Sequence, residues 1–100
     1  MELPTNGWKN KNGTSERSCK CTSWKNHWIS QTGQKWPDKC FVEGCNSEPI
    51  LGAHIINTSK EINSEYIAPF CDKCNKQNGE FKLKGGKTLA LANKQETCAK

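Results

Sequence analysis

One hundred residues form a single domain, and a chain of this length buries little apolar surface. Only 33% of the residues are hydrophobic and the mean hydropathy is −0.88, so packing alone leaves the fold marginal, and no stretch approaches the roughly 20 apolar residues of a membrane span. The formal net charge of +5 favours an anionic partner only mildly, because ordinary solubilising lysines explain it at least as well.

The first twenty residues are rich in Gly, Asn and Lys, and Trp8 is their one large apolar anchor. They predict a polar arm over residues 1–20, loosely ordered except near Trp8, ahead of a single domain over residues 21–100. The start also lacks the basic stretch followed by an apolar run that marks a secretory signal. We therefore expect a reducing, cytoplasmic location without a membrane partner.

The segment 24–31 has helical spacing, because Trp24, Trp28 and Ile29 fall on one face. A threonine and a serine precede it as candidate N-caps, and Gly33 can close its last turn. The pattern predicts a short amphipathic helix.

The tryptophans Trp24, Trp28 and Trp36 have two interpretations. Exposed aromatic rings among lysines can stack on unpaired bases. A chain this poor in aliphatic residues needs its tryptophans as core, however, so the core interpretation is preferred.

Two pairs of cysteines have the spacing of a metal site, and together they would supply four sulfur ligands: Cys40, Cys45, Cys71 and Cys74. Gly44 gives the first pair the backbone freedom of a tight knuckle. In a reducing compartment such pairs more often bind metal than form disulfides. We predict one structural Zn²⁺, because a closed four-thiolate site leaves no position for water or substrate. Bound zinc would lower the formal charge to about +3 and add folding free energy on the order of 10 kcal/mol.

Between the two pairs, residues 50–56 suggest a hairpin strand, with a tight bend or a close backbone approach at Gly52. Residues 57–65 are polar throughout except Ile62, which predicts a surface loop.

After the second pair, residues 74–79 predict a short helix that Gly79 stops, with the second pair at its start. Residues 81–84 and 87–92 flank Gly85-Gly86, which predicts a two-stranded C-terminal hairpin. The predicted fold class is therefore α+β.

The order of these motifs resembles the zinc-stapled branch of the HNH endonucleases. The resemblance covers roughly residues 38–80 and rests on the knuckle, on Gly52-Ala53-His54-Ile55-Ile56, on Tyr66 to Cys71, and on Cys74-Asn75. It implies a treble clef, in which a zinc knuckle, a β-hairpin and a short helix surround the metal.

The resemblance also implies roles for two residues. His54 would be the general base that activates water against a phosphodiester, and Asn75 would help to hold a second divalent cation such as Mg²⁺. Ala53 and Tyr66, however, stand where the family often carries a metal-ligating residue and an Asn. A second interpretation of His54 is a hairpin histidine whose ring is bonded to a backbone carbonyl.

These observations leave three functions open. The first is a non-catalytic domain that binds nucleic acid, with DNA favoured by the resemblance. The second is a metal-dependent endonuclease, and the third is a protein-interaction module. The candidate nucleic-acid-binding residues lie beside the last cysteines and around the glycine turn: Lys73, Lys76, Lys82, Lys84 and Lys87.

Three further cysteines, Cys19, Cys21 and Cys98, lie near the chain ends. With His27 they could form a second tetrahedral site, although ligands separated by one residue are awkward for one ion. They could instead form a disulfide from Cys98 to Cys19 or Cys21, or remain free thiols.

Overall fold

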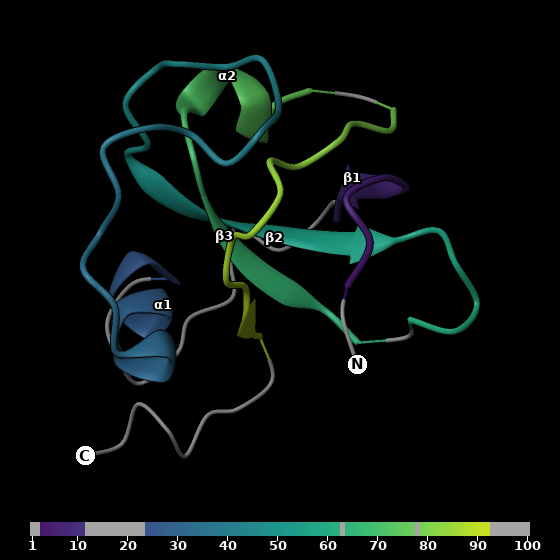
Figure 1. Cartoon of the computed structure of the whole chain (residues 1–100), viewed down its shortest axis with the longest axis horizontal. Helices are drawn as coiled ribbons and strands as arrows, with labels where there is room; N and C mark the ends of the chain where they lie inside the picture. Colours follow the sequence, from purple (N-terminus) through teal and green to yellow (C-terminus); the bar gives the residue numbers. More distant parts are fainter. Residues whose placement is uncertain (1–2, 12–23, 63, 78, 93–100) are drawn as a thin grey trace.

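The computed structural model describes residues 3–11, 24–62, 64–77 and 79–92. Four strands form one antiparallel sheet in the order β1-β2-β3-β4 (Figure 1). The strands are β1 (Trp8–Asn10), β2 (Leu51–Asn57), β3 (Tyr66–Phe70) and β4 (Ala90–Leu91), and the helices are α1 (Trp24–Thr32) and α2 (Asp72–Asn75). The α+β class predicted from the sequence is confirmed. No helix in the described ranges is long and apolar enough to cross a membrane.

The helix predicted from the tryptophan spacing is confirmed as α1. Gly33 has a φ of +69° and donates its N–H to the Ile29 carbonyl at 2.8 Å, which ends the helix with a left-handed residue. The buried side chains of α1 are His27 and Trp28, whereas Trp24 and Ile29 are only partly buried. The helix therefore inserts one tryptophan and one histidine into the core.

Gly52 is the point where α1 meets the sheet. A Cβ on Gly52 would lie 2.6 Å from the backbone carbonyl carbon of Trp24 and 2.9 Å from Cγ2 of Ile67. The close backbone approach predicted at Gly52 is therefore confirmed. The tight bend that the sequence also allowed there is wrong, because Gly52 lies within β2 and pairs with Pro69.

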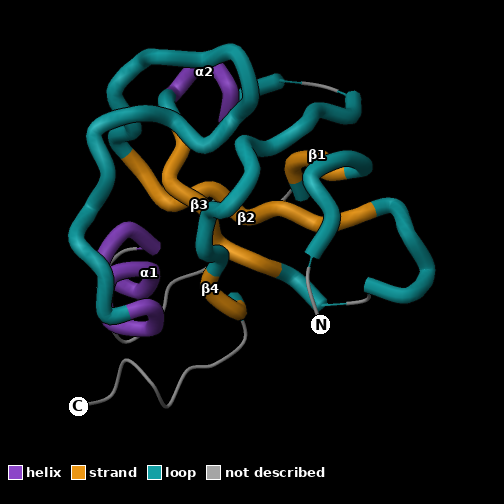
Figure 2. Tube along the Cα trace, in the orientation of Figure 1, coloured by secondary structure: helices purple, strands orange, loops and turns teal. Residues whose placement is uncertain are grey.

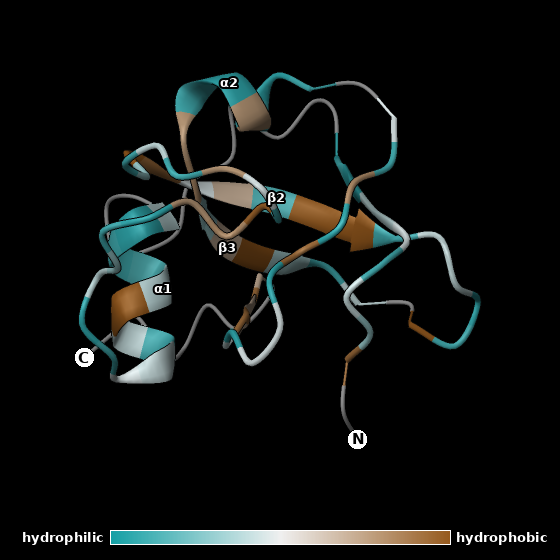
Figure 3. Cartoon of the chain, turned by 45° about the horizontal axis from the view of Figure 1, so that its top comes forward, coloured by the Kyte–Doolittle hydropathy of each residue, from teal (hydrophilic) through white to brown (hydrophobic). Residues whose placement is uncertain are grey.

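The central hairpin joins β2 and β3 through five paired positions, from Leu51–Phe70 to Ile55–Tyr66. The connection between them is a loop, as the polar sequence predicted, although Ile62 turns inward and is buried. The brown colour along β2 and β3 in Figure 3 marks the apolar residues that this hairpin brings to the core.

The predicted C-terminal hairpin is wrong. Phe81 and Leu83 form isolated bridges with Trp8 and Val42, and β4 pairs instead with the start of β3. The physical reason is that the two predicted strands, 81–84 and 87–92, bury their apolar side chains against different neighbours. The ring of Phe81, for example, packs edge-on against Phe70 at 5.4 Å between centroids. The turn itself forms at Gly85-Gly86.

The N-terminal prediction also needs correction. Trp8–Asn10 of the predicted polar arm form strand β1, which pairs with β2, and Trp8 is fully buried. The indole nitrogen of Trp8 donates to the Pro4 carbonyl at 2.9 Å, so burial leaves that N–H bonded. Residues 12–20 lie outside the described ranges.

Candidate metal centre

The structure brings the four predicted cysteines together. Their Sγ atoms all lie within 4.8 Å of one another, and those of Cys45 and Cys71 are 3.7 Å apart. Two sulfurs come from the loop before β2, one comes from the residue after β3, and one comes from α2. Four sulfurs in this arrangement could hold one metal ion.

A tight knuckle presents the first pair. The Cys40 N–H donates to the Ser47 carbonyl at 2.8 Å, and the Cys45 N–H donates to the Val42 carbonyl at 3.0 Å. Gly44, between them, has a φ of +84°, a conformation that glycine adopts at no steric cost. These bonds fold the segment back on itself, so both of its sulfurs face the same point.

The second pair is presented by the end of β3 and the start of α2. Cys71 is the N-cap of α2, and its Sγ accepts the Cys74 N–H at 3.5 Å. The Cys71 N–H donates to the Cys40 Sγ at 3.4 Å. Since α2 covers Asp72–Asn75, the predicted helix over 74–79 begins two residues too late: Cys71 takes the cap, so Cys74 falls inside the helix.

Protonation differs among these thiols. Burial raises the pKa of Cys40 despite backbone N–H bonds that lower it. Burial and the neighbouring sulfurs also raise the pKa of Cys74 above its ordinary value. Hydrogen bonding from the backbone of Ser47 lowers the pKa of the more exposed Cys45 to about 7. Burial and crowding therefore favour neutral thiols at Cys40 and Cys74, and a cation bound among the four sulfurs would favour their thiolate forms.

The five predicted nucleic-acid-binding lysines have different environments. Lys84 donates its Nζ proton to the Cys45 carbonyl at 2.7 Å. Lys76 forms an ion pair with Asp72 at 3.1 Å, and the Nζ of Lys87 lies 5.6 Å from the ring centroid of Phe41. The other two, Lys73 and Lys82, are exposed.

His54 is buried and contacts a carboxylate. Its Nε2 lies 2.7 Å from Oε1 of Glu65, and the other oxygen of Glu65 lies 3.4 Å from the Nζ of Lys11. The ring also packs edge-on against Trp24 at 5.0 Å. Burial would raise the pKa of Glu65, but the hydrogen bond and positive charge of His54, with Lys11, hold it below its usual value. No local sequence signal indicated Glu65 as a partner of this ring.

The structure does not bring His54 and Asn75 together. Asn10 pairs with Ile55, so the two side chains share one face of the sheet, and the Asn10 amide donates to the Cys74 carbonyl at 2.9 Å. The segment containing Asn75 therefore lies on the Ile55 face. His54 precedes Ile55 and points to the opposite face, toward α1. The helices α1 and α2 lie in separate parts of the fold (Figure 2).

The tryptophan environments favour the core interpretation over base stacking. Trp28 is 1% exposed and donates its indole N–H to the Thr88 carbonyl at 3.0 Å. Trp36 is partly buried and donates to the Pro49 carbonyl at 3.0 Å, and Trp24 packs against the core.

The second site predicted near the chain ends lies mostly outside the described residues, since Cys19, Cys21 and Cys98 fall there. Its fourth member, His27, is described and fully buried. The Nε2 of His27 lies 2.7 Å from the Leu91 carbonyl oxygen, which ties α1 to β4.

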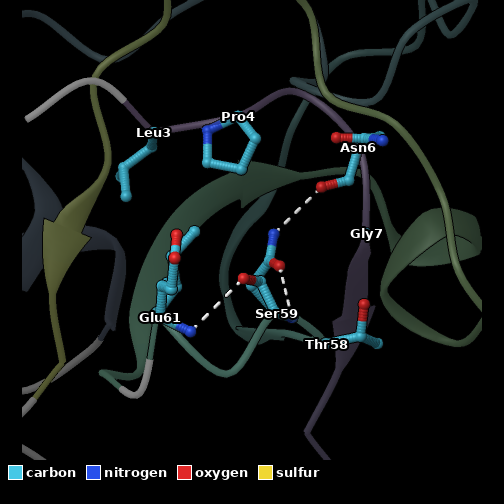
Figure 4. A pocket seen from close by; sticks show the side chains of 9 residues that line it. Leu3, Pro4, Asn6, Gly7, Thr58, Ser59 and Glu61 are labelled. Atoms are coloured by element: carbon cyan, nitrogen blue, oxygen red, sulfur yellow. Dashed lines mark hydrogen bonds between the residues drawn. The ribbon is translucent and has the colours of Figure 1, made fainter.

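A cavity of about 570 Å³ opens between the N-terminal segment and the loop after β2 (Figure 4). Several of its polar groups bond to each other: Asn57 donates to the Asn6 carbonyl at 3.0 Å and accepts the Ser59 N–H at 2.9 Å. Glu61 is its one charged lining residue among those described, and no thiol or imidazole of the described chain lines it. Its polar lining also includes the hydroxyls of Thr58 and Ser59.

Comparison with protein-family models, with curated proteins and with solved structures finds no match to this chain. The resemblance to the HNH endonucleases thus stays a prediction, and the site is interpreted from its own geometry.

Proposed function

We propose that this chain is a zinc-stapled scaffold domain, in which one Zn²⁺ bound by four thiolates stabilises the fold. The observation that carries the proposal is the convergence of four cysteines from two separate segments, with all Sγ atoms within 4.8 Å of one another.

The sulfur geometry fits such an ion. In a tetrahedral site with Zn–S bonds of about 2.3 Å, neighbouring sulfurs lie about 3.8 Å apart. The Sγ atoms of Cys45 and Cys71 are 3.7 Å apart. A set of four sulfurs also selects zinc over Mg²⁺ or Ca²⁺, which prefer oxygen ligands.

A structural role follows from the donor set. Four thiolates complete the coordination of zinc and leave no open position for a reacting water. Two N–H···S hydrogen bonds, one each to Cys40 and Cys71, would stabilise the anionic centre. The knuckle, the β2–β3 hairpin and α2 surround the sulfurs in the order of a treble clef, and we propose that fold family on this arrangement.

Nucleic-acid binding is the second candidate function. It is supported by the net charge of +5 and by the exposure of Lys73 and Lys82, which leaves their ammonium groups accessible to phosphates. The measurement is fluorescence anisotropy with labelled single- and double-stranded DNA at several salt concentrations. An affinity for DNA that falls steeply with salt, and that is lower in the double variant Lys73→Gln/Lys82→Gln, would support nucleic-acid binding. If no DNA binds at low salt, a protein-interaction module is the better interpretation.

Endonuclease activity has no comparable support. His54, predicted as the general base, points to one face of the sheet, whereas the segment containing Asn75, predicted to hold a divalent cation, packs on the other.

The zinc proposal is tested by metal analysis and folding together. Protein purified under reducing conditions should carry one zinc per chain, and a chelator should abolish the dispersed amide spectrum, which added Zn²⁺ should restore. Cys74→Ser should lose both zinc and dispersion, whereas Asn46→Ser, an exposed position within the knuckle, should keep both. A well-dispersed, zinc-free wild type would overturn the proposal.

A further inference from the structure

The four cysteines are not equally shielded from solvent. Cys40 is fully buried, and Cys71 and Cys74 are each 6% exposed, whereas Cys45 is only partly buried. The Sγ of Cys45 lies 3.7 Å from that of Cys71. The cluster therefore has one cysteine that is partly open to solvent, and its sulfur is in contact with the sulfur of a buried cysteine.

We infer that the metal centre is also a redox switch, in which a hydroperoxide oxidises Cys45 and a Cys45–Cys71 disulfide then expels the ion. The inference rests on the proposed zinc function and names a regulation of that site.

The chemistry balances in two steps. The Cys45 sulfur attacks one peroxide oxygen, the O–O bond breaks, and the products are a sulfenic acid and, from H₂O₂, one water. The Cys71 sulfur then attacks the Cys45 sulfur, so that an S–S bond forms, the S–O bond breaks and a second water leaves. Two thiolates and two protons are consumed, the sulfurs lose two electrons and the peroxide gains them. Zinc keeps its charge and loses two of its four ligands.

The disulfide would change the site without separating its segments. Cys71 caps α2 and accepts the Cys74 N–H, and a disulfide sulfur is a weaker acceptor than a thiolate. The new bond would still join the knuckle to the end of β3, as the metal does. Reduction in the presence of zinc should therefore rebuild the site.

The environment of Cys45 favours attack there. Lys84 donates its Nζ proton to the backbone carbonyl of Cys45 at 2.7 Å, which places an ammonium group beside the backbone of this residue. A nearby cation stabilises the oxygen anion that leaves as the O–O bond breaks.

The test uses the zinc-loaded full chain under hydrogen peroxide, with released zinc followed by a colorimetric chelator. The early disulfide is mapped by differential alkylation and peptide mass spectrometry. The disulfide is mapped again in the triple variant Cys19→Ser/Cys21→Ser/Cys98→Ser, in which only the four cysteines of the cluster can form disulfides. We expect zinc release to parallel a Cys45–Cys71 disulfide, and a thiol reductant with added zinc to reverse it.

Two variants sharpen the result. Cys45→His keeps a zinc ligand but cannot form the disulfide, so peroxide-driven release should slow at least tenfold. Cys74→His also leaves three thiolates and a histidine but keeps the reactive pair, so its rate should stay within about twofold of wild type. If either variant fails to bind zinc, the disulfide found first in the wild type decides whether the switch operates through Cys45 and Cys71.

The outcomes separate the two claims. A protein that never binds zinc contradicts the proposed function. A zinc-loaded protein whose first disulfide is not Cys45–Cys71, or whose zinc stays bound while the thiols oxidise, contradicts only the switch.

Discussion

The side-chain amide of Asn10 donates to the backbone carbonyl of Cys74 at 2.9 Å, and so joins strand β1 to the helix that carries one cysteine of the sulfur cluster. The same nitrogen lies 3.0 Å from the Gln77 carbonyl oxygen. The Asn10 amide thus bonds to one carbonyl inside α2 and to one just beyond its end. The N-terminal strand and the metal centre are therefore coupled, although 64 positions separate the residues.

We expect Asn10→Ala to weaken this coupling. Loss of the two hydrogen bonds should cost about 1–2 kcal/mol in unfolding free energy. It should also speed zinc transfer to a competing chelator several-fold, because α2 loses its anchor.

The matched control is Asn57→Ala, which removes a side-chain donor to the Asn6 carbonyl at the other end of the β1–β2 pairing. Its zinc transfer rate should match that of the wild type. Equal rates in both variants, measured by stopped-flow chelator competition, would show that Asn10 acts only on general stability.

Gly52→Ala should disrupt the contact between α1 and the sheet. The new Cβ would lie 2.6 Å from the Trp24 backbone, and backbone cannot yield as a flexible side chain can. We expect a loss of about 1–3 kcal/mol, measured by urea denaturation of the zinc-loaded protein. Gly85→Ala is the control, since nothing lies within 4 Å of the position its Cβ would take, and a comparable loss there would argue against the close approach at Gly52.

The His54–Glu65 pair predicts a pH-dependent contribution to stability. The pKa of Glu65 is lower in the folded state than its ordinary value of 4.5. Such a carboxylate contributes stability above its unfolded pKa and loses it as pH falls through the folded value. The wild type should therefore exceed Glu65→Gln by about 1 kcal/mol at pH 7, with the difference shrinking below about pH 4.5.

Urea denaturation of both proteins at one fixed zinc concentration measures this difference, because acid loss of zinc affects both alike. Glu61→Gln, at an exposed position of the same loop, should show no such pH-dependent difference. A wild-type advantage that grows as the pH falls below about 4.5 would contradict the contact.

Local pattern accounts for the parts of this fold that the sequence predicted. The spacing of Trp24 and Trp28 predicts α1, and the two cysteine pairs predict the sulfur cluster, since each pair needs only a short turn to converge. Gly52, flanked by apolar residues, indicated a close approach.

The remaining features depend on partners distant in sequence. No residue next to Phe81 in the sequence indicates that it pairs with Trp8. The Gly85-Gly86 turn instead favoured pairing of residues 81–84 with residues 87–92, which does not form. The partner of His54 is a carboxylate 11 residues away in a loop, which no periodicity reveals. The separation of His54 from Asn75 depends on strand register, which fixes the face of every side chain.

X-ray absorption at the zinc edge of the purified protein would identify the atoms bound to the metal. We expect one zinc with four sulfur neighbours at about 2.3 Å and no lighter atom directly bound to the metal. Nitrogen or oxygen among the bound atoms, or a folded protein without zinc, would contradict a structural centre formed by these cysteines: Cys40, Cys45, Cys71 and Cys74.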